Sequence, residues 1–368
     1  MACGGRKRGP LCLYYPRQGH LFPMRARTSC SGYRRAVIVA SAAFFYRASS
    51  ASRITTNTTG FANSQILNDP FPYHFPQENG SATRLFAMPL CNGVKIEEAT
   101  TEELQTYLAD GSLTSVQLVT CYTQRSFQTA EYINSVLEMN PDALAIAADL
   151  DHERKNGQVR SPLHGIPFLV KDNIASKDKL QTTAGSWALQ GSIVPRDASV
   201  VNKLRKAGAV LMGKATLSEW ADMRSNDYSE GYSGRGGQAR SAYNLTVNPG
   251  GSSSGSAIAV SNNVVPFALG TETDGSVINP AERNAIVGIK PTVGLTSRSG
   301  VIPECTHQDT VGTFGKTVRD AVYALDAIYG VDSRDNYTSA QVGKTPQGGY
   351  VPYLSTASSL KGAKFGIP

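Results

Sequence analysis

The stretch DASVVNKLRKAGAVLMGKA, residues 197–215, places a helix pattern directly before a strand pattern. Its first part predicts a helix over 197–208, with Asp197 as the N-cap and Gly208 at the end. Its second part, AVLMGKA (209–215), is a short apolar run, which is typical of a buried strand. A helix that leads into a buried strand is half of a βαβ unit, so the stretch predicts an α/β fold.

The same alternation continues on both sides of this stretch. Upstream, we expect a capped helix at 100–111 and a second helix at about 115–129. Two buried strands are expected at ALAIAAD (143–149) and HGIPFLVKD (164–172). Downstream, we expect helices at SAIAVSNNV (256–264) and VRDAVYALDAIYG (318–330). A strand is expected at VPFALGTETDG (265–275), and the start of another at KFGIP (364–368). This order predicts a mixed, largely parallel β-sheet surrounded by helices.

The net charge of +7 is concentrated near the start of the chain. Residues 1–60 hold ten Lys and Arg and no acidic residue, which leaves 26 basic and 29 acidic side chains in the rest. The body of the chain therefore has no electrostatic basis for binding nucleic acid. No apolar run approaches the roughly 18 residues of a membrane span, so no membrane-spanning segment is expected.

Composition divides the chain into three parts. Residues 1–60 form a basic leader, 61–92 an irregular lead-in, and 93–368 the folded domain. The Arg- and Ser-rich leader suits mitochondrial targeting, and its apolar stretch AVIVASAAFFY (37–47) suits secretion. A disordered extension or a misassigned start codon is an equally good interpretation, so the localisation stays open.

Cysteine and histidine residues give no sign of a metal centre. The six cysteines are scattered and form no CxxC pair, and none of the five histidines belongs to an HExxH motif. The cysteines also do not form the dense pattern of a disulfide framework.

The block NPGGSSSGSA (248–257) admits three interpretations. A flexible linker is excluded by its position inside a continuous α/β pattern. A structural helix-entry turn is possible, because hydroxyl groups often cap free N–H groups there. The block also matches the GxSxG nucleophile elbow, with Ser253 as nucleophile, but the only histidine downstream is His307 in a polar stretch.

A lysine can activate a serine if the lysine is neutral. Lys171 ends the predicted strand HGIPFLVK, which would bring its amine to the edge of the sheet where α/β proteins bind ligands. For base catalysis its pKa must fall from about 10.4 to about 7–8. The plain alternative is a solvated lysine that pairs with Asp172.

Three segments occur in order along the chain, GIPFLVKDNI (165–174), NPGGSSSGSA (248–257) and ALGTETDGSVINPAERNAIVGIKPT (268–292). With them the sequence resembles the amidase signature family, and closely its fungal amidases, from about Val94 to the end. The resemblance implies an α/β core with a mixed sheet surrounded by helices. It also implies hydrolysis of carboxylic amides through a Ser–cis-Ser–Lys triad and an acyl-enzyme, without a metal or cofactor.

Carried onto this chain, the resemblance assigns the base to Lys171, the serine after a cis peptide bond to Ser252 and the nucleophile to Ser276. The oxyanion would be bound by backbone N–H groups of the turn that ends in the nucleophile, at Thr273, Asp274, Gly275 and Ser276.

The segment GKATLSEWADM (213–223) resembles the family's acyl-pocket segment, with Trp220 as the lining residue, although Trp220 could simply belong to the core. The turn departs from the family form GTDTGGSIRxP. Glu272, Asp274 and Ile278 replace the Asp, Gly and Arg of that form. The loss of the Arg puts the salt bridge that would support this turn in doubt.

These observations favour an amidase that acts on a small-molecule amide. Two alternatives remain. One is the amidase subunit of a tRNA-dependent amidotransferase, and the other is an inactive fragment. The family's members continue well beyond the equivalent of Pro368, so the chain is expected to be an incomplete domain. The sequence indicates neither the particular amide nor the oligomeric state.

Overall fold

The computed structural model describes residues 86–223, 229–364 and 366. The predicted leader and most of the lead-in lie outside the described residues, as do three of the five residues of the predicted strand start at 364–368.

A six-stranded mixed sheet organises the described residues, with the order β1-β3-β2-β6-β8-β7. Strands β2, β3, β6 and β7 run in the same direction, and β1 and β8 run opposite to them. The strands are β1 (Val136–Met139), β2 (Pro167–Lys171), β3 (Val210–Ala215), β6 (Phe267–Glu272), β7 (Val287–Ile289) and β8 (Thr310–Gly315). A separate two-stranded ribbon consists of β4 (Tyr232–Ser233) and β5 (Gly237–Gln238). The mixed α/β architecture predicted from the sequence is confirmed.

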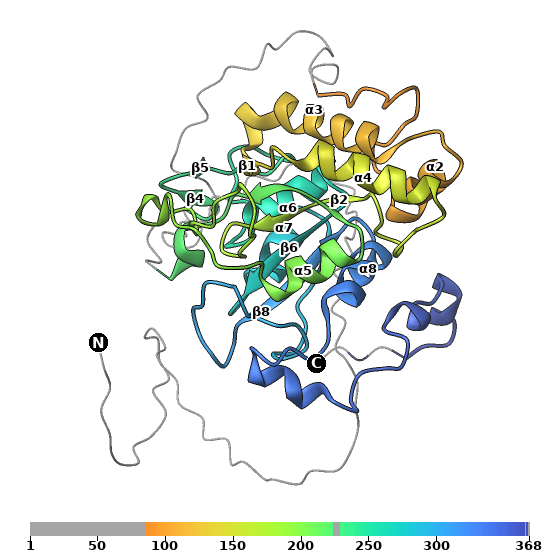
Figure 1. Cartoon of the computed structure of the whole chain (residues 1–368). Coiled ribbons are helices and arrows are strands. Elements are labelled where there is room, and N and C mark those ends of the chain that lie inside the picture. Colours follow the sequence, from red (N-terminus) through yellow and green to blue (C-terminus); the bar gives the residue numbers. More distant parts are fainter. Residues whose placement is uncertain (1–85, 224–228, 365, 367–368) are drawn as a thin grey trace, which may run out of the picture. The chain divides into compact units, whose positions relative to one another are not determined.

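Helices surround this sheet (Figure 1). They are α2 (Thr101–Ala109), α3 (Ser115–Ile133), α4 (Ala143–Lys155), α5 (Ser199–Lys206), α6 (Ser254–Ser261), α7 (Ile278–Arg283) and α8 (Val318–Ile328). Short 3₁₀ helices are η1 (Trp187–Leu189), η2 (Glu219–Asp222), η3 (Asn336–Gln341), η4 (Val351–Tyr353) and η5 (Ala357–Leu360). Helix α3 packs on α4, α5 packs on α8, and α6 packs on β2 and β6. Within the described residues, no helix combines the length and the apolar character needed to cross a bilayer.

The predicted start of helix α2 is confirmed in detail. The Thr100 side chain accepts the N–H of Glu103, and the Glu103 carboxylate accepts the N–H of Thr100, which is a complete capping box. Leu104 and Leu108 are buried on one face, and Gly111 follows the helix with φ +79°. This left-handed conformation is the one that glycine adopts most easily at a helix end.

Two predictions about elements are wrong. The segment 143–149 begins helix α4 instead of forming a strand, and it buries Ala143, Ala147 and Leu150 at helical spacing. Asp197 does not cap α5, because Ala198 occupies the N-cap position. The Asp197 carboxylate instead accepts the N–H of Lys177 at 2.6 Å.

The core lies between the sheet and its helices and continues across neighbouring strands. Phe168 of β2 pairs in register with Phe267 of β6, and their rings stack with centroids 5.4 Å apart. A disulfide joins Cys91 to Cys121, which ties the segment before α2 to helix α3. The sequence had not indicated this pairing, because nothing in the spacing of these cysteines distinguished them from the others.

Helix α6 approaches the sheet closely because its residues are small. A Cβ atom added at Gly255 would lie 2.5 Å from both the N and the O of Thr216, which follows β3. Only glycine therefore fits at this position. The close approach fixes the start of α6, and with it the serines that precede the helix, beside the ends of β2, β3 and β6.

Candidate active site

The site begins where two parallel strands end at one edge of the sheet. Lys171 is the last residue of β2, and β6 runs beside it in the same direction as far as Glu272. The Lys171 side chain is fully buried, and its Nζ donates to the backbone carbonyl of Thr271 at 3.2 Å. Neighbouring parallel strands thus bring an amine and the start of the following turn together.

The serine block places a hydroxyl group next to this amine. The Gly251–Ser252 peptide bond is cis, and the Ser252 carbonyl accepts the N–H of Ser218 at 3.1 Å. The Ser252 Oγ lies 2.6 Å from Lys171 Nζ and 2.9 Å from Ser276 Oγ. Lys171, Ser252 and Ser276 therefore form a continuous hydrogen-bonded chain, and the structure brings together all three residues that the resemblance assigns to a triad.

Burial makes Lys171 a stronger candidate for a base than an ordinary lysine. Removal from water lowers the pKa of Lys171 to about 8, against the opposing effect of the carboxylates of Glu304, Asp222, Glu230 and Glu272. A charged amine is costly in such an environment, so the neutral form becomes accessible near neutral pH. The alternative of a solvated Lys171 paired with Asp172 finds no support, because Lys171 has no exposed surface.

The turn after β6 presents the hydroxyl of Ser276. The Glu272 carboxylate accepts the N–H groups of Val277 and Ile278 at 2.8 and 2.9 Å, which fixes the chain just beyond Ser276. The carbonyl of Ser276 accepts the N–H of Ser253 at 3.2 Å. Ser276 is 6% exposed, whereas Ser252 and Lys171 are fully buried. Of these three hydrogen-bonded residues, Ser276 is therefore the one that a substrate can reach.

The same turn offers N–H groups for a developing negative charge. Within the described part of the chain, no hydrogen-bond acceptor is found for the backbone N–H groups of Thr273, Asp274, Gly275 and Ser276. Gly275 has φ +127°, whereas exposed Asp274 does not adopt a positive φ, so the glycine alone provides the unusual backbone conformation. Free N–H groups beside a nucleophile are what acyl transfer requires.

Ser253 is engaged elsewhere. Its fully buried side chain donates to the carbonyl of Thr271 at 3.0 Å. His307, the histidine that a nucleophile elbow would need, lies 2.6 Å from the hydroxyl of Tyr337 through its Nδ1. No contact joins Ser253 to a histidine among the described residues, and the geometry gives no support to the elbow.

Among the residues that the structure describes, no hydrogen bond joins Trp220 to Lys171, Ser252 or Ser276. It is half-buried in η2, where its backbone N–H donates to the carbonyl of Ala184 at 2.9 Å. Trp220, Ala221 and Asp222 all adopt positive φ angles. The assignment of Trp220 to the acyl pocket stays a prediction.

Sequence reasoning missed a second buried lysine. Lys214 of β3 is fully buried, and its Nζ donates to the carbonyl of Ile174 at 2.5 Å and to the hydroxyl of Thr182 at 3.0 Å. Burial lowers the pKa of Lys214 to about 8, against the attraction of Asp172. Asp172, for its part, accepts N–H groups of Thr183 and Gly185 at 3.2 and 3.0 Å.

Two carboxyl groups near Lys171 were also missed. Burial raises the pKa of Glu230 to about 7, with a further contribution from Asp222, and burial raises the pKa of Glu304 to about 7. The Glu230 Oε2 occupies the space that a Cβ of Gly251 would need, and it accepts the Ser218 hydroxyl at 3.0 Å. Both residues lie in loops, where no periodic pattern points to them. Among the described residues, no cluster of His, Cys, Asp or Glu is arranged to hold a metal ion.

Comparisons with known proteins point to one family. The model of the family described as Amidase matches residues 117–368. A relative in Schizosaccharomyces pombe, whose name assigns it to the amidases, is 60% identical over 318 residues, covering 86% of this chain and 54% of the relative. The solved peptide amidase of Stenotrophomonas maltophilia has a TM-score of 0.66 and 46% identity, covering 69% of this chain and 52% of that one.

A more distant relative bears on the amidotransferase alternative. It is a glutamyl-tRNA(Gln) amidotransferase subunit of Symbiobacterium thermophilum, which is 38% identical over 262 residues, covering 70% of this chain and 51% of the relative. The chain spans about half the length of the curated relatives it matches.

Proposed function

The chain belongs to the amidase family, and from that premise we propose that it hydrolyses carboxylic amides, with Ser276 as nucleophile, Ser252 as proton relay and Lys171 as base. The observation that carries the proposal is the hydrogen-bonded chain from Lys171 Nζ through Ser252 Oγ to Ser276 Oγ, at 2.6 and 2.9 Å. These distances lie in the range across which protons are transferred between hydrogen-bonded groups.

In the first half of the reaction, Ser276 Oγ attacks the amide carbon and its proton moves to Ser252, whose own proton moves to neutral Lys171. The carbonyl oxygen becomes an oxyanion, which the free N–H groups of residues 273–276 stabilise. The C–N bond then breaks as the leaving nitrogen takes a proton back through Ser252. The products of this half are an ester on Ser276 and free ammonia or amine.

In the second half, water attacks the ester carbon. Its proton passes through Ser252 to Lys171, the bond to Ser276 Oγ breaks, and the serine recovers a proton along the same route. The carboxylic acid leaves, and each residue returns to its starting state. Lys171 therefore acts twice, as base for the attack and as acid for the leaving group.

The proposal is tested by release of ammonia from primary carboxamides and by labelling with a fluorophosphonate. Ser276→Ala should abolish both, and Ser252→Ala should lower turnover nearly as much, because triad members act as a unit. Ser253→Ala is the matched control, since this neighbouring serine is equally buried but bonds to Thr271 instead. It should retain much of the turnover. Loss of turnover in Ser253→Ala with retention in Ser252→Ala would contradict the relay.

A second candidate is the amidase component of a tRNA-dependent amidotransferase, supported by the 38% identity to the amidotransferase relative of Symbiobacterium thermophilum. That function requires glutamine as the ammonia donor. A glutaminase assay with and without the other components of the enzyme distinguishes the two functions. Hydrolysis of simple amides by the chain alone favours the first, and activity that depends on glutamine and partners favours the second. Absence of any labelling at Ser276 would indicate an inactive fragment.

A further inference from the structure

A cavity of about 220 Å³ opens beside the turn that carries Ser276. Its wall includes Thr271 and Glu272, the last residues of β6, and Thr273, the first residue of the nucleophile's turn. Thr273 and Ser276 are three Cα–Cα steps of about 3.8 Å apart, so the cavity's edge lies within about 11 Å of the nucleophile. At about 30 Å³ per water, its volume equals roughly seven waters, which suits a short side chain of a substrate.

One buried group in this wall has no partner. Asn173 is 2% exposed, and its Nδ2 donates to the Thr271 hydroxyl at 2.9 Å. Its Oδ1 has no hydrogen-bond partner within the described residues. A buried carbonyl oxygen without a donor costs about 1–3 kcal/mol. This oxygen has almost no accessible surface, so the cavity does not present it to a ligand.

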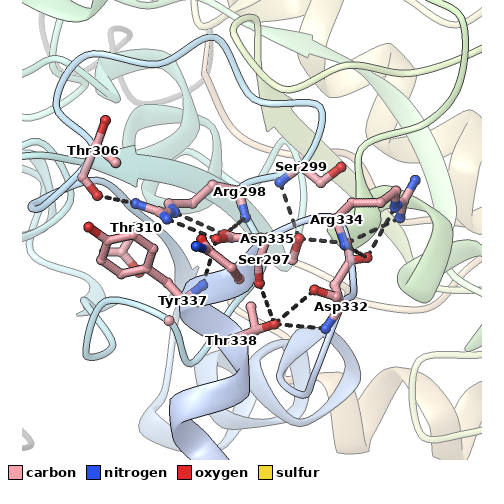
Figure 2. Close-up of polar contacts among 12 residues, drawn as sticks. Ser297, Arg298, Ser299, Thr306, Thr310, Asp332, Arg334, Asp335, Tyr337 and Thr338 are labelled. Atoms are coloured by element: carbon pink, nitrogen blue, oxygen red, sulfur yellow. Dashed lines mark hydrogen bonds and ion pairs between the residues drawn. The ribbon is translucent and has the colours of Figure 1, made fainter.

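The positive charges of the wall are already neutralised. Arg298 binds both carboxylate oxygens of Asp335 at 2.8 and 2.9 Å, donates to the Thr306 carbonyl and lies over the Tyr337 ring (Figure 2). Arg334 binds Asp332 at 3.0 and 3.2 Å, as Figure 2 also shows. Neither guanidinium is left available as the main binding group for an anionic ligand.

Two other carboxylates of the wall, Asp309 and Glu304, are not paired with its arginines in the described structure. Asp309 accepts N–H groups from Glu304 and Cys305 and the Thr273 hydroxyl at 2.7 Å. Glu304 forms no ion pair within the described residues, and its side chain is hydrogen-bonded to Thr273. The apolar residues Val301, Ile302 and Pro303, which directly precede Glu304 in the chain, also line the cavity. An alkyl chain that ends in a positive charge matches this combination.

We propose that this cavity is a substrate subsite that binds an ammonium-bearing alkyl substituent of the amide, through the carboxylate of Glu304. The inference rests on the proposed amide hydrolysis for its place in the reaction, but the subsite itself can be measured without turnover. The remaining carboxylates near Lys171, including Asp222 and Glu230, add to the attraction for cations and disfavour anionic substrates.

Binding of pentylammonium chloride tests the subsite directly, with pentanol as the uncharged analogue, by isothermal titration calorimetry. A charged hydrogen bond should make pentylammonium bind roughly ten- to hundredfold more tightly than pentanol, and added salt should reduce the difference. Glu304→Gln should remove most of this preference. Glu131→Gln, an exposed glutamate on α3, is the matched control and should preserve it.

Turnover provides the second measurement. Primary amides with a terminal ammonium group and two to five methylene groups are compared with amides that end in methyl, by kcat/KM. A parallel series carries the ammonium on the amine side. In one of these two series, kcat/KM for the ammonium amide should exceed that for the methyl-ended amide by roughly tenfold or more at one chain length. Equal binding of pentylammonium and pentanol, or a preference that survives Glu304→Gln, would overturn the subsite. Tight pentylammonium binding with no labelling of Ser276 would instead overturn the proposed hydrolysis and leave the subsite standing.

Discussion

Amide hydrolysis should rise with pH until Lys171 is neutral. With a pKa of about 8, about 9% of Lys171 is neutral at pH 7, whereas the ordinary pKa of 10.5 would leave about 0.03%. The difference corresponds to about 3.4 kcal/mol. Between about pH 6 and pH 9, kcat/KM should therefore rise about 90-fold and approach a plateau. An unperturbed lysine would give a rise of about 1000-fold over this range with no plateau.

The assay is kcat/KM for a neutral primary amide, with the rate of fluorophosphonate labelling as a second measure. Lys214 also has a pKa near 8, so the plateau alone does not identify Lys171. Glu304 raises the pKa of Lys171 but is not among the groups that act on Lys214. Glu304→Gln should therefore move the profile to lower pH. A profile that rises without a plateau, or that Glu304→Gln leaves in place, would refute the assignment of the base.

Two further predictions concern stability. Lys214→Met should lower the free energy of unfolding by about 1–3 kcal/mol, because the buried Ile174 carbonyl and Thr182 hydroxyl lose their donor and Asp172 loses a nearby cation; an unchanged Tm in thermal denaturation would contradict this. Reduction of the Cys91–Cys121 disulfide, which closes a loop of 30 residues, should cost about 3–4 kcal/mol in the chain-entropy model. A reductant should therefore lower Tm, and the double replacement of both cysteines by serine should abolish this sensitivity; a Tm that does not respond to reductant would count against the pairing.

Most of the α/β order could be predicted from periodicity, and the exception has a physical reason. A seven-residue apolar run such as 143–149 does not by itself distinguish a buried strand from a helix. Its alanines and leucine favour helix, and the polar residues that follow extend α4 to Lys155. The error at Asp197 is of a different kind, since the N–H of Lys177 binds the carboxylate that would have capped the helix. That donor is distant in sequence and could not be anticipated.

The residues of the candidate site also differ in whether the sequence could reveal them. Lys171, Ser252 and Ser276 could be proposed because each lies in a distinctive local motif, and the fold then brings the motifs together. Glu304 and Lys214 could not be proposed, because their importance comes from burial and from neighbours on other elements. Single residues in loops and on strands carry no pattern that reveals such an environment.

The most direct test of the account is peptide mapping of the fluorophosphonate adduct. The account predicts one covalent label, on Ser276, because it is the only one of the three residues with any exposed surface and its hydroxyl is linked through Ser252 to Lys171. The label should be absent in Ser276→Ala and present in Ser253→Ala. A label on Ser253 would contradict the Ser276–Ser252–Lys171 assignment and return the serine block to the nucleophile-elbow interpretation.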